Sequence, residues 1–181
     1  AGGRGQAPEG AGPAGIGRLG ETLATAAGRW AKETSGVVVV IPLHPAQDAA
    51  ASRRLAGLAA AEGGRVHAVL GPLDFRSARA VISALDIVVS VRYHGVLFAA
   101  AGGVPCVGVA YDPKVEALSG TLGVEALPLS AGASEVRDAI LRAWENGAEL
   151  KERLRRKADE LRKRAIAEGG RPREIVEGTV R

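Results

Sequence analysis

Two cations and a histidine follow apolar segments that have the composition of buried strands. Segment 87–91 leads directly into Arg92 and His94, and segment 105–110 leads into a turn that contains Lys114. An arginine binds a carboxylate or phosphate through two parallel hydrogen bonds, and a histidine can carry a proton near neutral pH. Side chains of these types around one pocket suit a small ligand that carries several negative charges.

The apolar pattern predicts how these residues are brought together. Short β-branched runs alternate with helical stretches through residue 111, the order expected of a parallel, doubly wound sheet covered by helices on both faces. In such a sheet the carboxyl ends of the strands form the ligand crevice, and each following helix presents free N–H groups to it. The predicted strands are 37–41, 66–70, 87–91 and 105–110, and the predicted helices are 16–32, 48–62, 75–84, 93–102, 134–146 and 148–167.

A third candidate group follows the first predicted strand, in segment 41–50. His44 and Gln47 are expected on the same edge of the sheet, in reach of a sugar or a phosphate. Asp48 is interpreted as a cap of the next helix, because a carboxylate at a helix start accepts hydrogen bonds from free N–H groups. His67 lies inside the second predicted strand and is interpreted as structural.

The composition limits the class of protein. Of the 181 residues, 46% are hydrophobic and only 3% are aromatic, so the core must consist mainly of small and aliphatic side chains. A net charge of +4 permits an anionic ligand, and the few aromatic residues argue against nucleic acid as a partner. The single cysteine, Cys106, excludes an internal disulfide and is interpreted as a buried core residue rather than a reactive thiol.

No cofactor or metal is expected from the motifs present. The clusters of a zinc site or a Ser-His-Asp triad are not recognisable, and neither a Walker loop nor a dinucleotide fingerprint is found. No membrane-spanning helix is predicted, because the uncharged stretch 95–111 contains a proline and several glycines.

The ends of the chain differ from its middle. Residues 1–15 are rich in glycine and proline and are predicted to be a disordered linker, residues 16–167 to be one Rossmann-like domain, and residues 168–181 to be a flexible tail. Because the sequence contains no methionine, we expect it to be a piece of a longer protein. The predicted helix 148–167 alternates basic and acidic residues, which is typical of a solvated helix face. A contact with anionic lipid headgroups is the alternative.

Stretch 92–118, RYHGVLFAAAGGVPCVGVAYDPKVEAL, resembles the signature region of the polysaccharide pyruvyl transferase family of the CsaB type. It contains an R-x-H motif, an alanine-rich helix, a GVP turn and a Tyr-Asp-Pro-Lys-Val sequence. The upstream IPLHPAQD is similar to another segment of this family, and the resemblance covers roughly residues 16–129. Tyr93 is a departure, because leucine is common at this position of the motif.

The resemblance implies a fold like the C-terminal half of a GT-B enzyme, with the N-terminal domain outside this sequence. It implies that pyruvate is transferred from phosphoenolpyruvate, as a ketal, onto a sugar of a lipid-linked cell-wall glycan. The acceptor is often N-acetylmannosamine, and the product anchors S-layer proteins. Such an enzyme is expected in the cytoplasm at the inner face of the membrane, with phosphoenolpyruvate as donor and no cofactor.

The resemblance also assigns residues. The family's donor-site histidine and lysine correspond to His94 and Lys114, and its signature arginine corresponds to Arg92, so these three are the predicted catalytic residues. The predicted substrate-binding residues are His44, Gln47, Ser90, Tyr111 and Asp112.

Two other functions fit parts of the same pattern. The first is a GT-B glycosyltransferase that uses a nucleotide sugar, for which Glu116 is the only nearby acidic residue that could bind the ribose. The second is a module without catalytic activity that binds an anionic glycan or a partner subunit. Protection of the fold by a nucleotide sugar, but not by phosphoenolpyruvate, would favour the glycosyltransferase.

Overall fold

The computed structural model describes residues 13–69 and 71–169, and in these ranges seven helices and five parallel strands form a Rossmann-like α/β fold. This confirms the predicted fold class. The strands are β1 (Val37–Val40), β2 (Arg65–Ala68), β3 (Val88–Ser90), β4 (Cys106–Ala110) and β5 (Ala126–Pro128). The helices are α1 (Pro13–Thr34), α2 (Pro45–Ala61), α3 (Phe75–Ser83), α4 (Tyr93–Gly102), α5 (Pro113–Leu122), α6 (Ala133–Glu145) and α7 (Gly147–Gly169).

Most predicted elements are present, with shifted ends. α4 covers the predicted range, whereas α1 begins at Pro13, inside the predicted linker. The rest of that linker, most of the predicted tail and the predicted strand residue Leu70 lie outside the described residues. β5 was not predicted because it is short, and α5 was not predicted because the Tyr-Asp-Pro-Lys sequence at its start was interpreted only as a turn.

The strands belong to two parallel sheets, one with the order β1-β2 and one with the order β3-β4-β5. β1 and β3 face each other across a cavity of about 110 Å³ that is lined by Val39, Ile41, Ile87 and Val89, among others. The chain therefore runs outward from β1 to β2 and then returns to β3 on the other side. This reversal is the topological switch point, where open α/β sheets bind their ligands.

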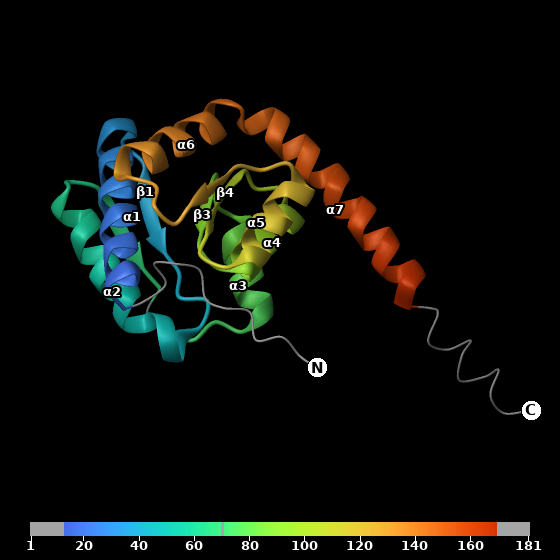
Figure 1. Ribbon diagram of the computed structural model, residues 1–181, viewed down its shortest axis with the longest axis horizontal. Coiled ribbons are helices and arrows are strands. Elements are labelled where there is room, and N and C mark those ends of the chain that lie inside the picture. Colours follow the sequence, from blue (N-terminus) through green and yellow to red (C-terminus); the bar gives the residue numbers. More distant parts are fainter. Residues whose placement is uncertain (1–12, 70, 170–181) are drawn as a thin grey trace, which may run out of the picture.

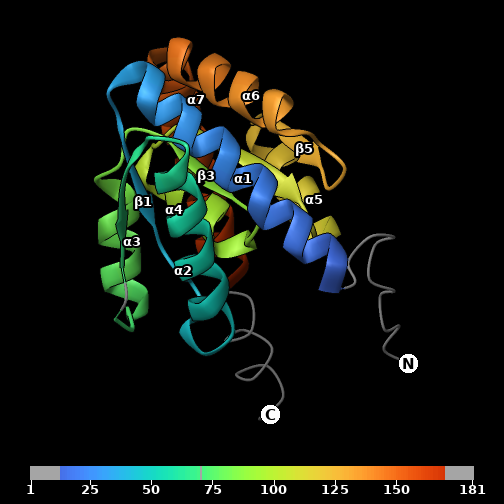
Figure 2. The ribbon, with the colours of Figure 1, turned by 90° about the vertical axis from the view of Figure 1, so that its left-hand side faces the viewer.

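Two hydrophobic clusters cover the two faces of β4. Cys106 belongs to a cluster with residues of α3, α4, α5 and α7, and the next residue, Val107, belongs to a cluster with residues of α1 and α6. Figures 1 and 2 show these helices around the strands. Successive strand residues point to opposite faces, so a strand buried on both faces has the continuous apolar sequence that was predicted.

The prediction that all strands are covered on both faces is wrong for β2. Along β2, exposed and half-buried residues alternate, and His67 is exposed. Among the described strands, β2 pairs only with β1 and so stands at the edge of its sheet, which explains why its sequence contains the polar residues Arg65 and His67.

α7 packs on α4 and then extends away from the rest of the domain (Figure 1). Its side chain Leu154 is fully buried, whereas Ile166 is 66% exposed. Three of its basic residues pair with acids one helical turn away, as expected for a solvated helix face. Among the described residues, no helix combines the length and the apolar character needed to cross a membrane.

Candidate functional site

The turn between β3 and α4 is shaped by Ser90. The Ser90 hydroxyl accepts the Arg92 N–H at 3.1 Å and donates to the Arg92 carbonyl oxygen at 3.0 Å. Arg92 is therefore the extended N-cap residue of α4, with φ −102° and ψ 134°. Ser90 was predicted to bind substrate, and in this structure its hydroxyl holds the turn that presents Arg92 and His94.

Gly95 allows the first turn of α4 to lie close to the end of β3. A Cβ atom added at Gly95 would lie 2.1 Å from the Oγ of Ser90 and 3.2 Å from the Cδ1 of Leu43. No side chain fits this space. The glycine after His94 is thus required by the packing that places His94 at the carboxyl edge of the sheet.

Arg92 forms an ion pair across the switch point. Its Nη2 donates to the Oδ1 of Asp48 in α2, and the Oδ2 of Asp48 accepts the backbone N–H of His44 at 3.1 Å. The prediction that Asp48 caps this helix is wrong in position, because the N-cap of α2 is His44 and Asp48 lies inside the first turn. Its carboxylate still stabilises the start of α2 through the His44 N–H, and it also binds Arg92, which was not predicted. This second contact joins the turn after β1 to the turn after β3.

His94 lies on the exposed side of α4, beside aromatic rings. Its ring centroid is 5.6 Å from that of Tyr93 and 5.9 Å from that of Phe98. In the part of the chain that the structure describes, no ion pair or side-chain hydrogen bond engages the imidazole of His94 or the ammonium group of Lys114. Both groups are therefore available to a ligand.

Lys114 is placed by the cap of α5. The carboxylate of Asp112 accepts the Lys114 N–H at 2.8 Å, and Pro113 occupies the first helical position. β3 and β4 are hydrogen-bonded neighbours, with Ser90 opposite Gly108. The turns that follow these two strands consequently open on the same edge of the sheet, which brings Lys114 to the side of the molecule that also carries His94.

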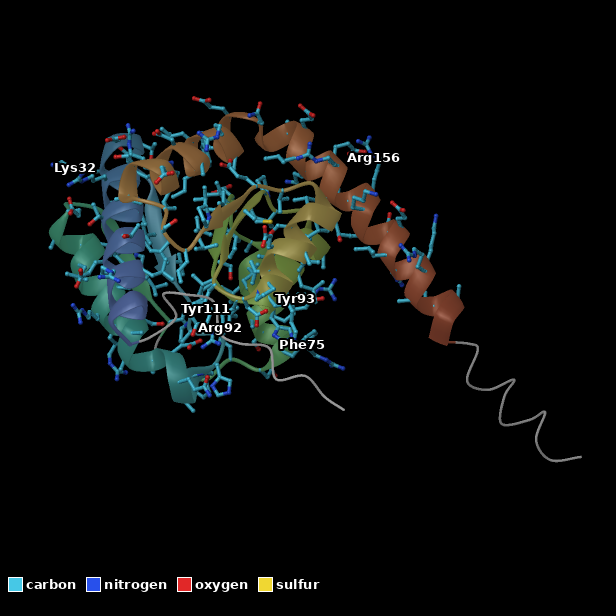
Figure 3. All side chains as sticks on the ribbon, in the orientation of Figure 1. Lys32, Phe75, Arg92, Tyr93, Tyr111 and Arg156 are labelled. Carbon is cyan, nitrogen blue, oxygen red and sulfur yellow. The ribbon has the colours of Figure 1, made fainter. Side chains whose placement is uncertain are left out.

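The remaining predicted residues lie on this edge too. His44 and Gln47 are exposed in the first turn of α2, and Tyr111 is half-buried directly after β4. Figure 3 shows Tyr111, Arg92, Tyr93 and Phe75 gathered at one end of the domain, whereas Lys32 and Arg156 lie toward the opposite end. Sequence reasoning missed Phe75, although it immediately follows the loop after β2 and so lies on the same edge.

Cys106 does not take part in this site. Its side chain is buried, as predicted, and burial raises the pKa of its thiol to about 12. The thiolate that would be needed for nucleophilic chemistry is therefore scarce near neutral pH. Among the described residues, no group of three or more His, Cys, Asp or Glu side chains is arranged to hold a metal ion.

A second cavity lies at the amino ends of β3 and β4. It has a volume of about 340 Å³ and is lined by residues that include Asp86, Pro105, Lys151 and Arg155. None of the predicted site residues borders it. The carboxyl edge, with its free histidine and lysine, remains the better candidate for chemistry.

Comparison with known proteins assigns the chain to a family. An α/β domain with cationic turns at its switch point has the architecture of a domain that binds an anionic ligand. The family model for polysaccharide pyruvyl transferase matches residues 18–113, more than half of the chain, so the chain belongs to this family of transferases. The match includes Arg92 and His94 and ends directly before Lys114. No curated protein and no solved structure matches the chain.

Proposed function

We propose that this chain forms the donor site of an enzyme that transfers pyruvate from phosphoenolpyruvate, as a ketal, onto a sugar of a cell-wall polysaccharide. The observation that carries the proposal is the presence of Arg92, His94 and Lys114 at the starts of two adjacent helices on one sheet edge. Family membership supports the same reaction class.

The charges of the donor match this edge. Phosphoenolpyruvate carries a carboxylate and a phosphate, and Arg92 and Lys114 supply a planar guanidinium and a compact ammonium for them. α4 and α5 both begin here, so their free N–H groups and positive dipole ends add to the attraction. Arg92 also binds Asp48, which leaves further guanidinium donors for the ligand.

The reaction needs one proton donor and two deprotonations. In the proposed mechanism the acid form of His94 protonates the methylene carbon of phosphoenolpyruvate, and one sugar hydroxyl attacks the adjacent carbon. The second hydroxyl then attacks the same carbon, and the C–O bond to phosphate breaks. One hydroxyl proton replaces the proton lost by His94, and the other leaves with the inorganic phosphate. Arg92 and Lys114 stabilise the charge on the departing phosphate.

The acceptor is proposed from the resemblance to the CsaB type. It is an N-acetylmannosamine unit of a lipid-linked secondary cell-wall polysaccharide, and the pyruvylated product anchors S-layer proteins. In this scheme the enzyme has a GT-B-like architecture, needs no cofactor and works at the cytoplasmic face of the membrane. There the basic residues of α7 would face anionic headgroups.

The test is a product assay with the full-length protein. Phosphoenolpyruvate and a synthetic β-N-acetylmannosaminyl lipid are supplied, and the ketal is detected by mass spectrometry together with released phosphate. We expect equal amounts of both products, and loss of both in His94→Ala and Lys114→Ala. Lys32→Ala, an exposed lysine far from the site (Figure 3), is the matched control and should retain activity. Consumption of a nucleotide sugar in place of phosphoenolpyruvate would overturn the proposal.

A further inference from the structure

The aromatic residues of this chain are few, and they are unevenly distributed. The sequence contains two Phe, two Tyr and two Trp. Trp30 is buried in the cluster between α1 and α6, and the exposed Trp144 packs against it with ring centroids 5.9 Å apart. Tyr93 and Phe98 instead lie beside His94, and Phe75 joins this second aromatic group by packing on Phe98. Half of the aromatic side chains thus belong to a group that includes the neighbours of one candidate catalytic residue.

The buried ring of Phe98 contacts two other rings, those of Phe75 and His94. It is buried in the core, and its ring lies 4.7 Å from that of Phe75, nearly perpendicular at 86°, and 5.9 Å from that of His94. Phe75 and His94 therefore pack on the same buried side chain. The distance between their ring centroids cannot exceed the sum of these two centroid distances. Edge-to-face packing of this kind fixes the orientation of an exposed ring.

Phe75 is far more exposed than a core residue. Its exposed fraction is 62%, and that of Tyr93 is 38%, although Phe75 is the first residue of a capped helix and is held in place. The cap is the carboxylate of Asp74, which accepts the Ser77 N–H at 2.7 Å. Two large aromatic rings therefore lie on a solvent-facing surface on the side of the domain that carries His94, where they contribute little to the core.

We propose that Phe75 and Tyr93 form a platform for a sugar ring of the acceptor glycan. This inference rests on the proposed function, because attack on the donor requires a sugar hydroxyl close to His94. A pyranose presents an apolar C–H face that packs on an aromatic ring, while its hydroxyl groups point outward to polar partners. Arg92 and Lys114 match the charges of the donor, whereas a donor with several negative charges gains nothing from apolar rings. The platform therefore binds the acceptor.

The test measures how the full-length protein binds the acceptor without any donor. A soluble β-N-acetylmannosaminyl oligosaccharide is titrated and followed by saturation-transfer NMR and calorimetry. We expect Phe75→Ala and Phe75→Leu to weaken acceptor binding about tenfold, the scale of a lost aromatic contact. Phe75→Trp should bind as well as the wild type. The leucine variant keeps apolar contact with Phe98 but removes the ring face. Ile166→Ala changes a similarly exposed apolar residue on α7 and should have no effect.

A kinetic measurement separates the platform from the donor site. In the ketal assay, Phe75→Ala should raise the KM for the acceptor about tenfold and leave the KM for phosphoenolpyruvate unchanged. Unchanged acceptor binding in Phe75→Ala overturns the platform, and so does an equal rise of both KM values. If Phe75→Ala alters only self-association in sedimentation, the ring is a protein contact and the inference is also overturned. Because glycan binding is read without turnover, it decides the platform even if no ketal forms.

Discussion

The carboxylate of Asp48, in the first turn of α2, binds the guanidinium of Arg92 at the start of α4. The two residues are 44 positions apart in the sequence, and they belong to turns that follow different sheets. β1 and β3 share no ladder hydrogen bond, so this ion pair is a direct link between the two sides of the switch point. It fixes the direction of one of the predicted donor-binding side chains.

Asp48→Asn should therefore weaken the binding of phosphoenolpyruvate clearly while lowering the free energy of unfolding only slightly. Both partners are partly exposed, and such a pair contributes only about 0–1 kcal/mol to the free energy of unfolding. We expect a several-fold rise in the KM for phosphoenolpyruvate with an almost unchanged melting temperature. Ketal kinetics and a thermal melt of the same preparation check this. A donor KM equal to that of the wild type would show that Arg92 is positioned without Asp48.

Gly95→Ala should destabilise the domain. The added methyl group would lie 2.1 Å from the Oγ of Ser90 and 2.8 Å from its Cβ, so either α4 or the end of β3 must move. Overpacking of this kind costs about 1–3 kcal/mol, and the measurement is chemical denaturation. Because the two shortest contacts are with the Ser90 side chain, Ser90→Gly in the same protein should restore part of the loss.

Gly57→Ala is the matched control for that substitution. Gly57 lies inside α2, and a Cβ atom there would meet nothing within 4 Å. An alanine in a helix interior is favoured over glycine by about 0.5–1 kcal/mol. This variant should therefore be more stable than the wild type. A loss of stability similar to that of Gly95→Ala would contradict the explanation by contact with Ser90.

Asp112→Ala should affect both the fold and the position of Lys114. The carboxylate of Asp112 caps α5 through the Lys114 N–H, and removal of such a cap costs about 1 kcal/mol. We expect a lower melting temperature and a lower kcat/KM for phosphoenolpyruvate. Asp112→Asn retains the hydrogen-bond acceptor and should keep most of the melting temperature and most of the kcat/KM of the wild type. Equal losses in the two variants would indicate that the negative charge, rather than the cap, is required.

Cys106 should be unreactive in the folded protein. Its buried thiol has a pKa of about 12, so an aromatic disulfide reagent at pH 8 should react only after denaturation. The same shift predicts a pH dependence of stability. The neutral thiol contributes fully to the free energy of unfolding below about pH 8.5, the pKa of a cysteine in the unfolded chain. This contribution is lost as the pH rises toward 12. Denaturation midpoints of the wild type should thus fall more steeply above pH 9 than those of Cys106→Ala.

The sequence predicted the layered fold because its strongest signal is burial. The continuous apolar run of β4 reflects packing on both faces, with Cys106 and Val107 in opposite clusters. β5 has only three residues, and only Leu127 among them is buried, so it carried too little pattern to be recognised. α5 was missed for another reason, since Pro113 was interpreted as part of a turn although proline is common at the first helical position.

The sequence was enough to predict which edge of the sheet carries the candidate site, but not which side chains contact each other there. Arg92, His94 and Lys114 could be placed on one edge because parallel strands end on the same side. The pairing of Arg92 with Asp48 and the packing of Phe75 on Phe98 join residues that are distant in sequence. Such contacts depend on how the helices lie on the sheets, and a single sequence carries no periodic signal for them.

The missing ladder between β1 and β3 has a mechanical consequence. A continuous sheet resists opening because each strand pair must break several backbone hydrogen bonds at once. Here the two sheets meet through apolar contacts around a small cavity, through the Arg92–Asp48 pair and through α1, which packs on both β1 and α6. A change in the width of the crevice along this seam would therefore break no strand pairing, because side-chain packing and ion pairs, rather than a strand ladder, hold the place where the proposed donor binds.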